Sequence, residues 1–208
     1  MAAVITEIDV PQTGELKIAA GTIVTPSARD LAVSRGVTII ELAKDKVVRE
    51  TSAEETVALG ADHGGYRLKE ALKPLFHELK LEVLDLGVHE EKSVDYPDIA
   101  EEVGAAILTR KAFRGVIIDG AGIGSAMAAN KMPGIRAALC YDKPSARNSR
   151  EHNDSNVLTL GGRLLTQTQA EDVVRIWLTT PFAAGRHSQR IEKIASIEQR
   201  YANWKPRN

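Results

Sequence analysis

Short apolar runs and helical patterns alternate from residue 56 to residue 201. TVALGA (56–61) is a continuous apolar run typical of a buried strand, and leucines then recur at the three- and four-residue spacing of an amphipathic helix. Repeated strand–helix units predict an α/β fold with a mainly parallel sheet covered on both faces. The expected strands are 56–61, 81–87, 116–119, 134–140 and 156–162, and the first helix is marked by Leu68, Leu72, Leu75 and Leu79.

Prolines and a threonine mark the later helices. Pro97 and Pro144 each fit the first turn of a helix, and Thr166 fits an N-cap. Pro74 lies inside the first helix and removes a backbone donor, so a kink or an early stop is expected there. A last helix is expected to carry Ile191, Ile194, Ile197 and Tyr201 on one face.

Residues 1–55 have a different pattern and are expected to form a small N-terminal extension of the main domain, 56–208. Two strands are expected at 16–21 and 37–43, with a short helix from Thr25-Pro26 to Gly36 between them. The polar stretch 45–56 fits a linker. Either the extension packs on the main domain, or it docks another protein. TPSARDLAVSRGV has a faint similarity to subunit-binding modules of 2-oxo acid dehydrogenase complexes and to cargo tags of bacterial microcompartments.

Composition narrows the class of protein. The 208 residues carry 27 Lys and Arg against 28 Asp and Glu, a net charge of -1, so no global field favours nucleic acid or anionic lipid. Cys140 is the single cysteine, which rules out an internal disulfide and a cysteine zinc site. We interpret it as a core residue. No apolar window approaches a membrane span. A cytoplasmic protein is expected.

Polar and glycine residues gather where the expected strands end. In parallel sheets ligands bind beyond the carboxyl ends of the strands, so these residues are expected to converge. They are Asp62, His63, Gly64 and Gly65 after the first strand; Asp119, Gly120, Gly122 and Gly124 after the third; Asp142 after the fourth; and Gly161, Gly162 and Arg163 after the fifth.

The turn after the third strand, within GVIIDGAGIGSAMAANK (115–131), predicts an anion site. A glycine turn entering a helix aims unpaired backbone N–H groups at one point, where an anion or a developing oxyanion can sit. A dinucleotide fingerprint is the competing interpretation. It needs a third glycine at position 125, where this chain has Ser125, and it disfavours the carboxylate of Asp119.

Histidines and arginines elsewhere add candidate groups. His152, in the polar segment SREHNDSN, can move a proton near neutrality. Arg186 and Arg190 are four residues apart, and guanidinium groups suit bidentate phosphate binding. His77 and His89 have no other candidate residues near them in the sequence, and we interpret them as structural or surface residues.

Five separated motifs together resemble the ribose-5-phosphate isomerase type B family, which includes galactose-6-phosphate isomerase subunits. They are ADHGGYRLKEAL, SVDYPDIA, GAGIGSAMAANKMPGIRAAL, SREHNDSNVLTLGGR and GRHSQRIEKI, and the similarity covers residues 56–201. The resemblance implies a Rossmann-like three-layer sandwich with a five-stranded sheet. It also implies a homodimer with shared active sites that interconverts aldose and ketose phosphates without metal or organic cofactor. Whether dimers pair into a tetramer is left open.

The resemblance also assigns roles to individual residues. His152 would assist ring opening, with Asn153 holding the substrate beside it. Phosphate would be held by Arg163, and by Arg186 and Arg190 of the partner subunit. Asp62 and His63 would contact the ring oxygen, hydroxyls and phosphate region of the sugar, and Tyr96 would line the pocket. The enediolate oxygen would be stabilised by the amides of Gly120, Ala121, Gly122 and Gly124.

The chain departs from the family pattern at the base. Many members carry a cysteine where this chain has Asp119 and a threonine or serine where it has Ala121, and others use a glutamate near the position of Ser125. We hypothesise that Asp119 replaces the cysteine, since carboxylates can remove protons next to a carbonyl group. The leading prediction is isomerisation of ribose 5-phosphate to ribulose 5-phosphate through a cis-enediolate. The alternatives are a non-catalytic sugar-phosphate-binding homologue and a nicotinamide-binding oxidoreductase.

Overall fold

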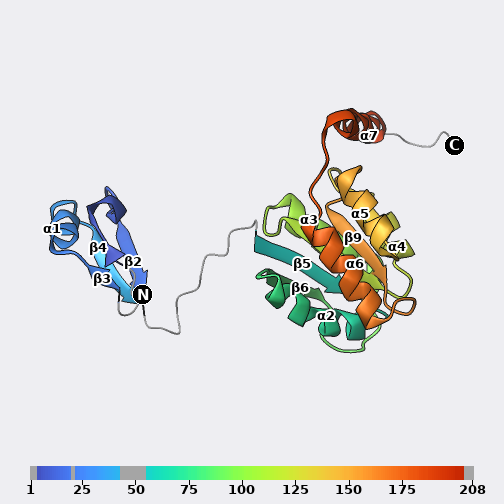
Figure 1. The fold of residues 1–208 in the computed structure, drawn as a ribbon, viewed down its shortest axis with the longest axis horizontal. Helices are drawn as coiled ribbons and strands as arrows, with labels where there is room; N and C mark the ends of the chain where they lie inside the picture. The colour runs from blue at the N-terminus through green and yellow to red at the C-terminus, as the bar shows by residue number, and fades with distance from the viewer. Residues whose placement is uncertain (1–3, 20–21, 43–54, 204–208) are drawn as a thin grey trace. The chain divides into compact units, whose positions relative to one another are not determined.

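The computed structural model describes residues 4–19, 22–42 and 55–203. Contacts divide the chain into two compact units, residues 1–50 and 51–208, both drawn in Figure 1. The expected linker falls largely on residues 43–54, which lie outside the described part. No described helix is long and apolar enough to cross a membrane.

The described part of the N-terminal unit, residues 4–19 and 22–42, contains two parallel strand pairs and one helix. β1 (Val4–Ile5) pairs with β3 (Ile23–Val24), and β2 (Glu15–Ala19) pairs with β4 (Thr38–Leu42). Helix α1 (Pro26–Ser34) starts where the sequence predicts, because the Thr25 side chain accepts a hydrogen bond from the Ala28 amide at 3.3 Å. A 3-10 turn, η1 (Glu7–Asp9), completes the unit. Its small core consists of Val10, Ile18, Val24, Ala28, Ala32 and Val37.

The second unit contains a five-stranded sheet with strand order β6-β5-β7-β9-β8, in which every pairing is parallel. This confirms the predicted fold class. Each expected strand is present, although the fourth is shorter than predicted. The strands are β5 (Thr56–Ala61), β6 (Glu82–Gly87), β7 (Arg114–Asp119), β8 (Ala137–Leu139) and β9 (Val157–Gly161).

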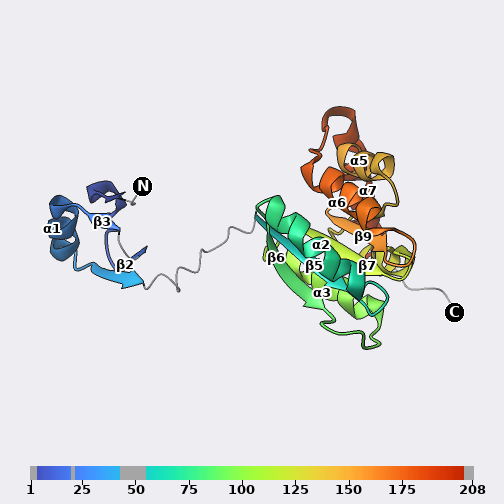
Figure 2. The same ribbon diagram turned by 60° about the horizontal axis from the view of Figure 1, so that its bottom comes forward.

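Helices cover both faces of this sheet, as Figures 1 and 2 show. One core cluster joins the sheet to α2 (Tyr66–Glu78), α5 (Lys143–Glu151) and α6 (Gln167–Thr179). A second cluster joins the other face to α3 (Tyr96–Leu108) and α4 (Ile123–Ala129). Beyond α6 follow a 3-10 turn, η4 (Gly185–His187), and α7 (Ser188–Tyr201). The second unit therefore has three layers, with the sheet between two layers of helices.

Two sequence expectations about single residues have opposite outcomes. The early stop at Pro74 is wrong, because α2 continues to Glu78. Pro74 has no N–H group to donate to the carbonyl four residues earlier, but it is exposed, so water can take the place of that donor. Buried Leu72 and Phe76 hold the helix on the sheet. The core interpretation of Cys140 is confirmed, since it is buried, and desolvation raises the pKa of its thiol.

A buried lysine fixes the end of β6. The Lys69 side chain has no exposed surface, and its Nζ donates to Asp85 Oδ1 at 2.6 Å and to the Val88 carbonyl at 2.7 Å. Burial alone would raise the pKa of Asp85, but Lys69 and Lys73 outweigh it and hold that pKa below its usual value. The network therefore anchors the segment that leads from β6 to Tyr96.

Helix α7 has the predicted apolar stripe, but the stripe is not buried within the unit. Ile194, Ile197 and Tyr201 are 45%, 53% and 56% exposed. No described residue of α7 is buried. Its apolar face is therefore available to a partner.

Candidate active site

Asp62 shapes the loop at the carboxyl end of β5. Its Oδ1 accepts hydrogen bonds from the amides of Gly64 and Gly65 at 2.8 and 3.0 Å, and the residue is 6% exposed. The adjacent His63 is exposed. The bound carboxylate holds the chain in a tight turn that presents His63 at the edge of the sheet.

Two neighbouring loops approach this turn so closely that only glycine fits. A Cβ atom at Gly64 would lie 3.0 Å from the Gly120 amide nitrogen, and one at Gly162 would lie 2.6 Å from the Gly64 carbonyl oxygen. The Arg163 side chain passes beside Gly120, 3.7 Å from where a Cβ would be placed there. The loops after β5, β7 and β9 therefore converge as predicted.

The carboxylate of Asp119 is enclosed by four hydrogen bonds. Its Oδ1 accepts from the amides of Ala121, at 2.7 Å, and Gly122. Its Oδ2 accepts from the Ser125 amide at 2.9 Å and from the Ser125 hydroxyl at 2.5 Å. Asp119 is only 5% exposed. Because a carboxylate offers about four lone-pair sites, this turn satisfies it completely.

This geometry corrects the predicted use of the glycine turn. The amides of Ala121 and Gly122 were expected to face an enediolate oxygen, but both donate to Asp119 instead. The sequence pattern could not reveal this, because it shows which amides a turn exposes but not which side chain reaches them. Within residues 55–203, the amides of Gly120 and Gly124 donate to no protein group. These two N–H groups remain as candidate oxyanion donors.

Tyr96 packs directly on the glycine turn. A Cβ atom at Gly124 would lie 2.6 Å from the Tyr96 ring, and the tyrosine is 41% exposed. The prediction that Tyr96 lines the site is therefore compatible with its position, since its ring covers the first turn of α4.

We expect Gly124→Ala to displace the Tyr96 ring and to lower the free energy of unfolding by about 1–3 kcal/mol, as overpacking does. Thermal unfolding followed by circular dichroism measures the change. The double variant Gly124→Ala, Tyr96→Leu removes the clashing ring and should recover most of the loss. A single variant as stable as the wild type would contradict this contact.

A cavity of about 300 Å³ opens at this edge of the sheet. Its lining contains two arginines and a histidine, which suits a phosphorylated ligand. One arginine, Arg67, is ion-paired with Glu91, whereas Arg163 is exposed. The lining residues are His63, Gly64, Arg67, Leu68, Glu91, Gly162 and Arg163.

The other predicted site residues lie at the opposite edge of the sheet. His152 and Asn153 follow α5 and precede the start of β9, and the Ala183 amide donates to the Glu151 carbonyl at 3.0 Å, which brings the segment before Arg186 to the same edge. Arg190 follows in α7. β7 has six residues, so the two edges lie about 16 Å apart at the usual strand rise. One chain does not bring all predicted residues together.

A second histidine packs against His152. The rings of His152 and His187 are stacked, with centroids 4.3 Å apart and planes 8° apart. His187 is 7% exposed, and its Nδ1 has no hydrogen-bond partner among the described residues. Burial lowers the pKa of His187, and the charges of His152, Arg186 and Arg190 lower it further, so the ring is neutral at pH 7. Sequence reasoning did not include His187 in the site, although its place in GRHSQR between two candidate arginines was a signal.

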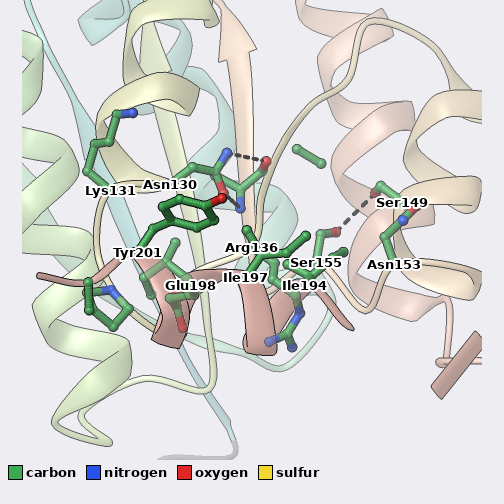
Figure 3. A pocket seen from close by; sticks show the side chains of 15 residues that line it. Asn130, Lys131, Arg136, Ser149, Asn153, Ser155, Ile194, Ile197, Glu198 and Tyr201 are labelled. Carbon is green, nitrogen blue, oxygen red and sulfur yellow. Dashed lines mark hydrogen bonds between the residues drawn. The ribbon is translucent and has the colours of Figure 1, made fainter. Parts of the chain in front are cut away.

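Near this edge lies a larger cavity of about 760 Å³, shown in Figure 3. Asn153 lines it together with Arg136 and with Ile194, Ile197 and Tyr201 of α7. Arg136 is engaged by Asp154 at 3.1 Å. The cavity therefore places an apolar helix face next to a predicted substrate contact.

These features define a class of protein. The second unit is a Rossmann-like α/β domain whose phosphate-suited cavity lies at the carboxyl edge of a parallel sheet, with a glycine turn beside it. A sequence model of the family described as Ribose/Galactose Isomerase matches residues 57–194. The chain belongs to this family.

Individual relatives agree with that assignment. Ribose-5-phosphate isomerase B of Escherichia coli is 41% identical over 69% of this chain and 97% of its own length. The solved ribose-5-phosphate isomerase B of Clostridium thermocellum is 45% identical, with a TM-score of 0.69 over 70% of this chain and 99% of its own. The type B enzyme of Trypanosoma brucei is 40% identical, with a TM-score of 0.68. The protein is therefore a sugar-phosphate isomerase.

Proposed function

We propose that the protein interconverts ribose 5-phosphate and ribulose 5-phosphate. The observation that carries this proposal is the 300 Å³ cavity, where Arg163 and His63 stand beside the glycine turn. A cationic rim suits a terminal phosphate, and the neighbouring unpaired amides suit a negatively charged oxygen. The names of the relatives from Escherichia coli and Clostridium thermocellum support ribose 5-phosphate as the substrate.

We propose further that two copies of the chain share each site. One copy would supply Asp119, Arg163 and the glycine turn, and the other would supply His152 and Arg190 from its opposite sheet edge. The 16 Å between the two edges supports this division. Exposed apolar side chains are available for the contact: Ile123 and Met127 of α4, at 49% and 64%, besides the stripe of α7.

In this scheme His152 opens the sugar ring. The proton of the anomeric hydroxyl moves through the imidazole to the ring oxygen while the bond from C1 to that oxygen breaks and C1 becomes a carbonyl. The phosphate would lie against Arg163 of one copy and Arg186 and Arg190 of the other. Asn153 and Tyr96 would hold the open-chain sugar.

Asp119 would then carry a proton between C2 and C1 through a cis-enediolate. Three of its four hydrogen bonds come from backbone amides fixed in the turn, whereas the Ser125 hydroxyl can rotate away. We therefore assign Oδ2, the oxygen that this hydroxyl can release, as the base. The amides of Gly120 and Gly124 would stabilise the enediolate oxygen.

We expect the purified protein to convert ribose 5-phosphate faster than allose 6-phosphate or galactose 6-phosphate. Ketose formation measured for all three substrates decides the preference. In heavy water, transfer through an enediolate should also leave deuterium at C2 of recovered ribose 5-phosphate. Turnover confined to a six-carbon phosphate would overturn the proposed substrate.

A further inference from the structure

We propose that Asn148 is a positioning residue for His152. It determines which ring nitrogen of His152 carries the proton and how readily the ring takes up a second proton. The inference rests on the proposed role of His152 in ring opening. It concerns a residue that neither the motifs nor the cavities at the site include.

The geometry joins the two side chains along the last turn of α5. Asn148 and His152 are four residues apart, and Asn148 Nδ2 lies 2.9 Å from His152 Nδ1. An amide nitrogen only donates, so Nδ1 accepts with its lone pair. A neutral His152 in this contact carries its proton on Nε2. Asn148 therefore selects the tautomer whose free N–H lies on the side of the ring away from α5.

The stack with His187 restricts rotation of the His152 ring. Its planes are 8° apart and its centroids 4.3 Å apart, so the His152 ring is held flat against a buried neighbour. With one face covered and Nδ1 engaged, the remaining edge with Nε2 is left for substrate. Two contacts from different elements, α5 and η4, thus fix one orientation.

The charged groups around His152 do not replace Asn148. From η4 and α7, Arg186 and Arg190 add to the effect of burial in lowering the pKa of the stacked His187. On α5, Glu151 is paired with Arg147 at 3.8 Å, and nearby Asp154 is held by Arg150 at 2.8 Å and by Arg136 at 3.1 Å. Among residues 55–203, no carboxylate hydrogen-bonds to the ring of His152. Asn148 is thus the polar partner of Nδ1.

An amide suits a ring that changes its protonation state. When His152 takes up a second proton on Nδ1, rotation of the Asn148 amide replaces its donor nitrogen by its carbonyl oxygen, which accepts from Nδ1–H. The imidazolium can then give its Nε2 proton to the ring oxygen as the C1 bond breaks, and Nε2 takes the proton of the anomeric hydroxyl as C1 becomes a carbonyl. The proton count on His152 is the same before and after.

The experiment compares Asn148→Asp and Asn148→Leu with the wild-type chain. NMR of the imidazole nitrogens gives the tautomer and the titration midpoint of His152, and the pH profile of kcat/KM on ribose 5-phosphate gives the effect on turnover. A carboxylate accepts but cannot donate, so Asn148→Asp should move the proton to Nδ1. It should also raise the titration midpoint and the matching limb of the pH profile by about one pH unit. Asn148→Leu should lower kcat about tenfold with little change in KM.

Lys143→Gln is the matched control. It changes the net charge by the same single unit on the same helix, but its ion-pair partner is Asp172 of α6, so it frees no carboxylate beside His152 and should shift the midpoint by less than a third as much. An equal shift in Asn148→Asp and Lys143→Gln would overturn the inference. So would a shifted NMR midpoint with an unshifted pH profile. Failure of the wild type to turn over ribose 5-phosphate would refute the proposed function instead, and the NMR titration would still decide the role of Asn148.

Discussion

Two inactive variants should recover activity when they are mixed. Asp119→Asn disables the carboxyl edge of the sheet and His152→Ala disables the opposite edge, and each alone should lose about 10²–10⁴-fold in turnover. If every site takes one edge from each of two copies, a hybrid dimer contains one intact site and one doubly disabled site. Random exchange makes half of the dimers hybrid, so turnover should return to about a quarter of the wild-type value.

The controls for the mixing experiment use variants of one edge only. Asp119→Asn mixed with Arg163→Ala should stay inactive, because both substitutions lie at the carboxyl edge and no hybrid then holds an intact site. Refolding the mixtures from denaturant ensures exchange of subunits. Recovery absent from the cross-edge mixture, with size-exclusion chromatography showing exchanged dimers, would refute the shared site.

Asp119→Asn is expected to have the second large effect, on turnover and on stability together. Asparagine keeps one side-chain oxygen and replaces the other by an NH2 group, which cannot accept a hydrogen bond. In the wild type each carboxylate oxygen accepts two hydrogen bonds, so the NH2 group would face either the amides of Ala121 and Gly122 or the amide and hydroxyl of Ser125. Leaving these buried donors unpaired costs about 1–3 kcal/mol. Turnover of ribose 5-phosphate and chemical unfolding measure the two effects separately.

Two further substitutions separate the base from the turn. Ser125→Ala removes one donor and leaves the carboxylate, so it should cost about 1 kcal/mol of stability and change turnover only a few-fold. Asp119→Cys should lose stability like Asp119→Asn but keep more turnover, since a thiolate can remove the proton. Wild-type turnover in a folded Asp119→Asn protein would end the assignment of Asp119 as the base.

The fold follows from the sequence because its signals are local. TVALGA forms β5 over the predicted residues, and Thr166 caps α6 where expected. The sequence-based predictions were wrong where the surroundings of a residue in the folded protein determine its structure. Pro74 does not end α2, since its exposed position tolerates the missing hydrogen bond, and the stripe of α7 is apolar without being buried in its own unit. Local pattern cannot tell an apolar face that is buried in the core from one that stays exposed.

The candidate site residues could be named from the sequence, but their separation between the two edges of the sheet could not be predicted. The rule for strand ends places Asp62, Asp119 and Arg163 correctly, because parallel strands share an edge. His152 and Arg186 carry no such signal, and only the connections around α5 and α6 place them at the other edge. The docking role of residues 1–55 stays a prediction. Neither the stack of His187 nor the contact of Asn148 can be seen in spacing alone.

The closed turn around Asp119 also constrains how this site could have diverged. A thiol cannot fill the place of two carboxylate oxygens that bind three backbone amides and a hydroxyl, so the same loop with a cysteine at position 119 would have to be held by other contacts. We therefore expect Asp119 and Ser125 to be coupled, because the hydroxyl of Ser125 contributes to stability only while position 119 accepts its hydrogen bond.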